Sequence, residues 1–208
     1  LSQLRVSVKT ETTNTETRSF KMHQKLLLDV IQRQAGSLSK AILEAVMNAV
    51  DAKATYVNVR MDHESLLIAD DGGGFKSKDN IIKFFEVFGQ PHDESEEKVY
   101  GTFRMGRGQL FAYGTNDWRT GKFRMLVDIK NKGLDYELAE NQKNTAGCQI
   151  RVKLYDDCSE MDQLTISRDL ERWCRYAPIK VYLNDKLIST DPAKHKWDHV
   201  TDDAYIRL

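Results

Sequence analysis

The sequence predicts an α+β fold, a two-layer sandwich in which helices cover one face of a mixed, mostly antiparallel sheet. Segments whose apolar residues recur at helical spacing alternate with short segments rich in β-branched and aromatic residues. Several predicted strands are joined by short links of the kind found in hairpins, which favour antiparallel pairing. The 208 residues, 40% of them hydrophobic, are enough to fill one main core.

An arm and two helices are expected at the N-terminal end. Residues 1–19 are rich in threonine and charge and hold few large apolar side chains, which favours an arm or a weak strand. Leucine, valine and isoleucine then recur at helical spacing until Gly36. Ser37 or Ser39 is a suitable cap for a second helix, which we expect to run to about Ala52.

Strands are expected from residue 56 onward. Tyr56–Met61 alternates with β-branched residues and Leu66–Ala69 follows a turn, so these two segments predict a hairpin. Residues 75–105 mix charge, phenylalanine, glycine and proline, which is typical of a mobile segment with short helices. The later elements are expected as strands at 123–129, 134–139 and 149–154, a helix at 163–176, and a hairpin of 179–183 and 186–189.

The overall composition excludes several classes of function. The chain has 31 basic and 31 acidic residues, so its net charge makes no case for nucleic acid or an anionic membrane as a partner. No apolar run reaches the ~18 residues that span a bilayer, and no signal peptide is evident. Three scattered cysteines indicate neither a disulfide framework nor a zinc site. We therefore expect a soluble, cytoplasmic protein with no membrane partner, and the ends of the chain suggest a fragment of a longer protein.

A narrow polar stripe marks the second predicted helix. Glu44, Asn48 and Asp51 fall at i, i+4 and i+7, while apolar residues cover much of the remaining circumference. A helix of this kind is mostly buried, so its polar stripe must meet water, a partner or a ligand. A solvated face is the simpler alternative.

The stretch LLIADDGGGF, residues 66–75, ends an apparently buried strand on acid and glycine. Asp70 closes the strand, where a lone carboxylate is costly unless it accepts a hydrogen bond. The exocyclic amine of adenine is one possible donor, and Gly72 and Gly74 would let the backbone approach a flat ring without interference from a Cβ atom. A flexible turn is again the simpler alternative.

A third glycine pattern lies in GTFRMGRGQLFAYG, residues 101–114. Gly106 and Gly108 precede a short predicted helix at 109–113, and such an entry offers free N–H groups to phosphate. The P-loop pattern is absent, because no Lys-Ser or Lys-Thr follows these glycines. The three-glycine dinucleotide fingerprint is absent as well.

In this fixed order, the patterns E-x-x-x-N-x-x-D-A, D-x-G-x-G and GxG before a helix resemble the GHKL ATPases. This family shares the Bergerat ATP-binding fold and includes ninety-kilodalton heat-shock chaperones, gyrase-type topoisomerases, mismatch-repair ATPases, MORC proteins and sensor histidine kinases. The resemblance spans Glu44 to about Val152. It implies an ATP-binding domain at 20–157 with a lid at about 76–105. Residues 158–208 would complete the domain or lead into a missing C-terminal domain.

The resemblance also implies roles for individual residues. Glu44 matches the glutamate that activates the attacking water, and Asn48 matches the asparagine that holds Mg²⁺. Asp70 matches the aspartate that reads adenine. Cys148 stands where the family usually has a threonine that supports adenine through a water molecule. A thiol is a poorer hydrogen-bond partner than a hydroxyl, so the resemblance does not settle whether this water contact is kept. The implied ATP-binding residues are Asn48, Asp51, Ala52, Asp70, Gly72, Gly74, Phe75, Lys83, Arg104, Gly106, Arg107, Gly108, Gln109, Leu110 and Cys148.

Three cations in or beside the expected lid have two interpretations. Lys83 lies where the chaperones usually have asparagine, so it either reaches phosphate or points into solvent. Arg104 and Arg107 flank the phosphate-binding glycines, and their alternative role is that of solvated lid charges.

The implied function is Mg²⁺-dependent binding of ATP and slow hydrolysis to ADP, with lid closure and nucleotide-dependent homodimerisation in a larger protein. In the family a following domain usually supplies a lysine to the γ-phosphate, so weak hydrolysis is expected from this chain alone. The alternatives are a nucleotide-sensing module without significant turnover, a phosphate donor domain of the histidine-kinase type, and a domain without a ligand. DNA or a client protein is a possible partner of the full-length protein, because fold does not settle function.

Overall fold

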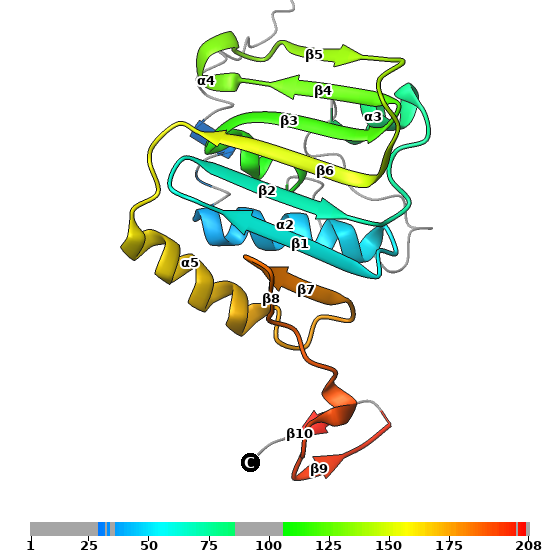
Figure 1. Ribbon diagram of the computed structural model, residues 1–208, viewed down its shortest axis with the longest axis vertical. Coiled ribbons are helices and arrows are strands. Elements are labelled where there is room, and N and C mark those ends of the chain that lie inside the picture. The colour runs from blue at the N-terminus through cyan, green and yellow to red at the C-terminus, as the bar shows by residue number, and fades with distance from the viewer. Residues whose placement is uncertain (1–28, 32, 34–35, 86–105, 203, 207–208) are drawn as a thin grey trace, which may run out of the picture.

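The computed structural model describes residues 29–31, 33, 36–85, 106–202 and 204–206. Figure 1 shows one broad sheet with helix α2 lying against one of its faces. The helices are α2 (Leu38–Asp51), α3 (Lys78–Phe85), α4 (Ile129–Lys132) and α5 (Glu160–Trp173), with 3₁₀ helices η1 (Gly106–Ala112) and η2 (Pro192–Lys194). The strands are β1 (Tyr56–Met61), β2 (Ser65–Asp70), β3 (Gly114–Gly121), β4 (Phe123–Val127), β5 (Tyr136–Ala139), β6 (Thr145–Leu154), β7 (Lys180–Leu183), β8 (Lys186–Leu187), β9 (His199–Val200) and β10 (Tyr205–Ile206).

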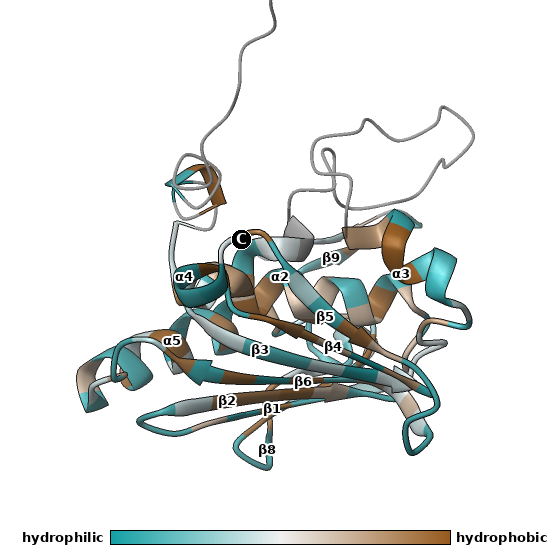
Figure 2. Cartoon of the chain, turned by 90° about the horizontal axis from the view of Figure 1, so that it is seen from above, coloured by the Kyte–Doolittle hydropathy of each residue, from teal (hydrophilic) through white to brown (hydrophobic). Residues whose placement is uncertain are grey.

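The main sheet has eight strands in the order β5-β4-β3-β6-β2-β1-β7-β8. Every neighbouring pair is antiparallel except β1 and β7, which are parallel. Figure 2 shows α2, α3 and α4 on the same side of the sheet. The expected α+β sandwich, with helices on one face of a mixed and mostly antiparallel sheet, is confirmed.

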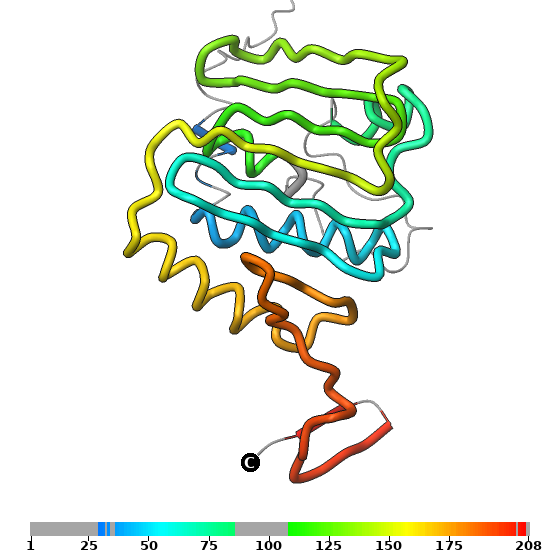
Figure 3. The backbone as a smooth tube through the Cα atoms, in the orientation of Figure 1, coloured from blue at the N-terminus to red at the C-terminus, as the bar shows by residue number. Residues whose placement is uncertain are grey.

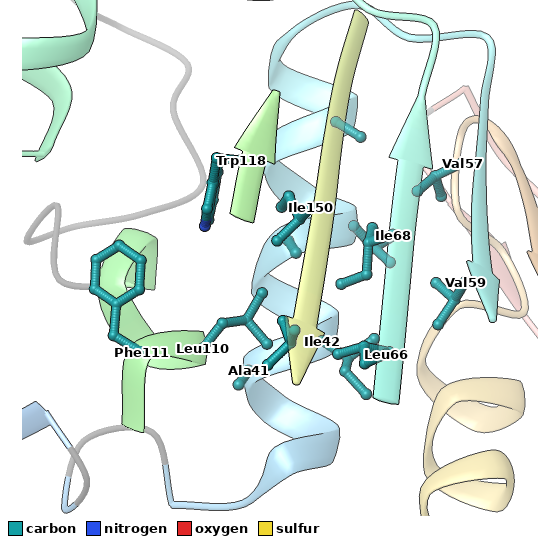
Figure 4. Close-up of a cluster of buried hydrophobic side chains, with 14 of the residues drawn as sticks. Ala41, Ile42, Val57, Val59, Leu66, Ile68, Leu110, Phe111, Trp118 and Ile150 are labelled. Atoms are coloured by element: carbon teal, nitrogen blue, oxygen red, sulfur yellow. The ribbon is translucent and has the colours of Figure 1, made fainter. Parts of the chain in front are cut away.

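The core lies between the sheet and α2. Strand residues alternate between the two faces of the sheet, so every second side chain points toward the helices. Figure 4 shows Ile68 and Ile150 on this face, opposite Ile42 of α2. All three side chains are buried. The strands at the centre of the sheet are therefore fixed in register by the side chains that they bury.

Helix α2 begins where the sequence predicts. The Ser37 hydroxyl accepts a hydrogen bond from the Lys40 backbone N–H at 3.3 Å, which makes Ser37 the N-cap of the helix. The buried side of the helix carries small and branched residues, namely Ala41, Ile42, Ala45, Val46 and Ala49. Its alanines let η1 and the strands β1 and β2 approach closely.

Strand β3 was not predicted by the sequence analysis. Its sequence, GTNDWRTG, is rich in residues that usually mark turns. It pairs nonetheless with β4 on one side and β6 on the other, and this tertiary pairing overrides the local preference. A Cβ atom on Gly114 would lie only 2.2 Å from the Lys153 carbonyl oxygen, so glycine there permits the close approach of β3 to β6.

Other expected boundaries also shift. The helix predicted at 109–113 is the 3₁₀ helix η1, and the strand predicted at 149–154 begins at Thr145. The strand predicted at 123–129 ends at Val127, because Asp128 caps the short helix α4. The strand predicted at 134–139 begins at Tyr136.

Helix α5 begins earlier than the predicted 163–176. A capping box between Ser159 and Asp162 starts it at Glu160, and its C-cap is Cys174. The hairpin that follows is shorter than predicted, with strands β7 and β8 joined by Asn184 and Asp185, both at positive φ. Figure 3 shows the chain leaving the sheet after β8 to form the separate β9–β10 hairpin. Within the described residues, no helix has both the length and the apolar character to cross a bilayer.

Candidate functional site

A cavity of about 320 Å³ lies at the C-terminal end of α2, beside the end of β2 and the first half of β6. This volume falls within the usual size range of small-molecule sites. The residues that line it are Ala45, Asn48, Ala49, Asp51, Ala52, Asp70, Gly74, Phe75, Phe84, Trp118, Cys148 and Ile150.

Asp70 is held on one side only. Its Oδ1 atom accepts hydrogen bonds from the backbone N–H groups of Gly72 at 2.8 Å and Cys148 at 3.3 Å. Its Oδ2 atom has no hydrogen bond with any described residue. Burial raises the pKa of Asp70, the two backbone N–H groups oppose this rise, and the charge of Asp71 adds to it. The site thus presents an oriented carboxylate with one oxygen available to a donor on a ligand.

The neighbouring Asp71 has a structural role, because its carboxylate is hydrogen-bonded to the backbone and not directed into the cavity. It accepts hydrogen bonds from the backbone N–H groups of Thr55 at 2.7 Å and Tyr56 at 3.1 Å, and from the Thr55 hydroxyl. These bonds, with that of the Thr55 hydroxyl the strongest, lower the pKa of Asp71. Asp71 therefore ties the glycine turn to the start of β1 and does not line the cavity.

The turn Gly72–Gly74 is packed too closely for larger residues at two of its three positions. The Gly73 N–H donates to the Ala52 carbonyl at 2.9 Å, and a Cβ atom on Gly72 would lie 2.9 Å from the Ala52 methyl group. Gly74 has φ +58°, and a Cβ atom there would lie 2.5 Å from the Thr120 hydroxyl. Glycine thus brings the backbone to the cavity wall, and Ala52 leaves room for it.

The polar stripe of α2 only partly faces the cavity. Asn48 and Asp51 line it, whereas Glu44, one turn earlier, is half-buried and is not among the lining residues. Burial raises the pKa of Glu44, and the charge of Asp51 raises it further. The Asn48 amide oxygen is a suitable hard ligand for Mg²⁺. Among the described residues, no group of three or more His, Cys, Asp or Glu side chains could hold a metal ion, so most ligands would come from phosphate and water.

Strand β6 supplies the wall opposite α2. Gly147 has φ +63°, and a Cβ atom there would lie 2.0 Å from the Asp70 carbonyl oxygen, so only glycine lets β2 and β6 approach here. Cys148 contributes its backbone N–H to Asp70. Burial, and next the charge of Asp70, raises the pKa of the Cys148 thiol well above its ordinary value, so this thiol stays neutral.

The glycines predicted to bind phosphate lie in η1, which packs against α2 and α3. Gly108 and Leu110 are buried and Gln109 is half-buried. Gly106 and Arg107 belong to the same 3₁₀ helix, although the Arg107 side chain lies outside the described part of the chain. Arg104 lies outside it altogether.

Of the other predicted residues, Lys83 is exposed on α3 and does not line the cavity. Gly72 lies directly beside the cavity, in the turn between Asp70 and Gly74. The structure thus brings seven predicted residues into the cavity wall, namely Asn48, Asp51, Ala52, Asp70, Gly74, Phe75 and Cys148.

Five lining residues were missed, and all are apolar or aromatic: Ala45, Ala49, Phe84, Trp118 and Ile150. Phe84 packs on Phe75 with ring centroids 4.8 Å apart, and Trp118 packs on Phe85 at 4.9 Å. In the sequence such residues look like core residues, because periodicity does not distinguish a cavity wall from a core.

Comparison with known proteins identifies the family. The family model described as "Histidine kinase-, DNA gyrase B-, and HSP90-like ATPase" matches residues 36–162, more than half of the chain. The chain therefore belongs to this family, the GHKL ATPases, and has the Bergerat fold. Membership supports ATP binding by this domain. No curated protein sequence matches the chain.

Two solved structures share this fold at a TM-score above 0.5. The ATPase region of Saccharomyces cerevisiae topoisomerase II aligns with a TM-score of 0.56 and 16% identity over 74% of this chain and 49% of that structure. The same region bound to ICRF-187 (dexrazoxane) gives a TM-score of 0.55, with 16% identity over 74% and 49% of the two chains. The N-terminal domain of a DNA repair protein aligns with a TM-score of 0.49 and 18% identity over 75% and 53%. The chain spans about half the length of the structures that it matches.

Proposed function

We propose that this domain binds ATP with Mg²⁺ and hydrolyses it slowly. The observation that carries the proposal is the state of Asp70, whose Oδ1 is held by two backbone N–H groups while Oδ2 is left for a ligand at the cavity wall. The amine of adenine donates to Oδ2. A purine with a carbonyl oxygen at that position would set oxygen against oxygen, so the site discriminates by charge as well as by shape.

The phosphates extend from the base toward η1. Asn48, one turn before the end of α2, supplies one ligand to Mg²⁺, and phosphate oxygens and water supply the others. Gly106 and Gly108 match the phosphate-binding glycines of the family, and their lack of side chains gives phosphate access to the backbone. When bound, Mg²⁺ offsets the negative charge of the phosphates.

Glu44 is the proposed general base for the attacking water. Its pKa is raised by burial and by Asp51, and a general base works best when its pKa approaches the working pH. The environment of Glu44 therefore shifts its pKa upward, toward the pH at which the enzyme would work.

We further propose that nucleotide binding closes a lid at about 76–105 and favours homodimerisation within a larger protein. Helix α3 lies at the start of this lid and carries Phe84 into the cavity wall, so occupancy of the cavity acts directly on the lid. A further domain, and DNA or a client protein as partner, belong to the proposal for the whole protein. The family match and the similarity in fold to a topoisomerase ATPase region, which is one part of a larger protein, support the proposal that this domain also works within a larger protein.

A nucleotide-sensing module is the second candidate function. The observation that favours it is that Glu44 is not among the residues that line the cavity. In that case Glu44→Gln changes neither binding nor the downstream response, whereas Asp70→Asn abolishes both. If ATP is hydrolysed, Glu44→Gln separates the two functions by stopping turnover while binding persists.

Thermal unfolding with and without Mg-ATP tests the proposed function. Ligand at ~100 times its Kd stabilises the native state by about 2.7 kcal/mol, which raises Tm by several degrees for a domain of this size. Asp70→Asn should lose this shift. The control Asp156→Asn removes the same charge at an exposed site away from the cavity and should keep it. Absence of a shift in wild-type protein at millimolar ATP would refute the proposal.

A further inference from the structure

Strand β3 carries two of the three buried polar residues in the described chain. These three are Ser39, Asn116 and Thr120. Asn116 and Thr120 lie four residues apart on the same face of β3, toward the helices, which corresponds to about 13 Å along a strand. Neither side chain lines the cavity. Burying a polar side chain costs free energy unless it forms hydrogen bonds, so the hydrogen-bond partners of Asn116 and Thr120 indicate what these side chains do.

Thr120 joins the glycine turn to β6. Its hydroxyl accepts a hydrogen bond from the Phe75 N–H at 2.9 Å and donates one to the Gly147 carbonyl at 2.8 Å. Gly74 passes so close that a Cβ atom there would lie 2.5 Å from this hydroxyl. Both segments that Thr120 connects flank Asp70, so one side chain fixes the spacing of the walls around the base end of the cavity.

Asn116 joins β3 to η1. Its amide Nδ2 donates to the Leu110 carbonyl at 3.1 Å and to the Gly114 carbonyl at 2.7 Å. Because both partners are acceptors, the orientation of the amide is fixed by its surroundings. The Oδ1 atom is buried and has no partner among the described residues. Leucine would avoid that cost, so the two donated bonds are what asparagine supplies here.

We infer that β3 sets the geometry of both ends of the nucleotide site, with Thr120 as the positioning residue for the base wall and Asn116 as the positioning residue for the phosphate-binding 3₁₀ helix. This inference rests on the proposed function. Thr120 acts through the backbone of Phe75 and Gly147, to which its hydroxyl is hydrogen-bonded. Asn116 acts through the carbonyl of Leu110 in η1. The consequence is that the two ends of the site can be loosened separately.

Calorimetric titration with ATP and with adenosine separates the two roles. Thr120→Val keeps the shape but loses both hydrogen bonds, and should raise Kd about tenfold for ATP and adenosine alike, equivalent to about 1.4 kcal/mol. Thr120→Ser keeps the hydroxyl and should restore wild-type binding. Asn116→Leu should raise Kd about tenfold for ATP and leave adenosine within about twofold. Asn116→Ala, a smaller change that also loses the amide donors and buries no charge, gives the same test if the leucine variant does not fold.

Thr165→Val is the matched control. The Thr165 hydroxyl donates to the Met161 carbonyl within the exposed part of α5, far along the chain from the site. Its loss should leave both affinities unchanged. A purely structural role for Thr120 and Asn116 would lower Tm without changing Kd in protein that is still folded.

Three outcomes would overturn the inference. Wild-type protein that binds neither ligand refutes the proposed function and this inference with it. If wild-type protein binds both ligands, the assignment to β3 alone is refuted when Thr120→Val changes neither affinity, or when Asn116→Leu changes both affinities by the same factor or neither of them. Wild-type protein that binds ATP but not adenosine also contradicts the inference, because the base end of the site would then bind too weakly on its own to be loosened separately from the phosphate end.

Discussion

Asp70 and Asp71 are adjacent carboxylates whose pKa values shift in opposite directions. Asp71 is exposed and accepts several hydrogen bonds, which stabilise its charged form and lower its pKa. Asp70 is half-buried with two bonds on one oxygen, and burial raises its pKa. Two adjacent aspartates at the end of a strand predict neither of these pKa shifts, because each shift depends on which segments of the folded chain lie beside the carboxylate.

The raised pKa of Asp70 predicts a pH dependence of stability without ligand. For a carboxyl whose folded-state pKa is raised, the folded state holds the proton more strongly than the unfolded state. The charged form therefore weakens the fold above the raised pKa, and this penalty disappears as the pH falls toward the unfolded-state value of about 4. Asp70→Asn should thus increase the free energy of unfolding at pH 7 while removing ATP binding.

Urea unfolding of both proteins at pH 5 and pH 7 checks this prediction. The difference in unfolding free energy between Asp70→Asn and wild type should be larger at pH 7. A variant that is less stable than wild type at pH 7 would contradict the burial argument.

Glu44 predicts a second pH effect, on turnover. A general base acts in its deprotonated form, so hydrolysis should rise with pH through the raised pKa of Glu44. Glu44→Gln should lower kcat by ~100-fold or more while ATP affinity stays within a few fold. Steady-state phosphate release, measured beside calorimetry, gives both values. Equal turnover in the two proteins would leave the nucleotide-sensing function as the better account.

At the scale of elements, the sequence predicted those whose burial follows a regular period. Helix α2, its Ser37 cap and the β1–β2 hairpin are confirmed, because each carries its own local signal. Strand β3 was missed, since its residues are of types that usually mark turns and its pairing with β4 and β6 leaves no local signal in the sequence. The site followed the same rule. Asn48 and Asp70, which were predicted as site residues, fall in the cavity wall, whereas Glu44 and Lys83 do not line it. Trp118 and Ile150 line the cavity but could not be told from core residues in the sequence.

The three consecutive glycines of the turn predict different tolerance to substitution. Gly74 has φ +58° and a Cβ atom would lie 2.5 Å from the Thr120 hydroxyl, whereas on Gly73 it would lie 3.6 Å from the Ala52 carbonyl, an ordinary contact. Gly74→Ala should lower the free energy of unfolding by about 2 kcal/mol or more and weaken ATP binding. The matched Gly73→Ala should stay within about 0.5 kcal/mol of wild type. Chemical denaturation of the two variants checks this, and equal effects would contradict the geometry of the turn.

At the scale of the whole molecule, one sheet and one helix bring together residues from distant parts of the chain. Asn48 comes from α2, Asp70 from β2 and Cys148 from β6, and they meet at a single cavity. The order of the motifs predicted this meeting only through resemblance to a family, because spacing along the sequence does not fix distance in space. The match to the family model covers residues 36–162 and so includes all three of these residues.

The central claim is that Asp70 reads the amine of adenine, and calorimetric titration of wild-type protein with Mg-ATP and with Mg-inosine triphosphate tests it most directly. The two nucleotides share their phosphates and ribose and differ only where adenine has an amine and hypoxanthine, with its ring N–H, has a carbonyl oxygen. We predict that ATP binds at least ~100-fold more tightly, about 2.7 kcal/mol, because the carbonyl would face Oδ2 of Asp70 without a donor. Equal affinities for the two nucleotides would contradict the claim.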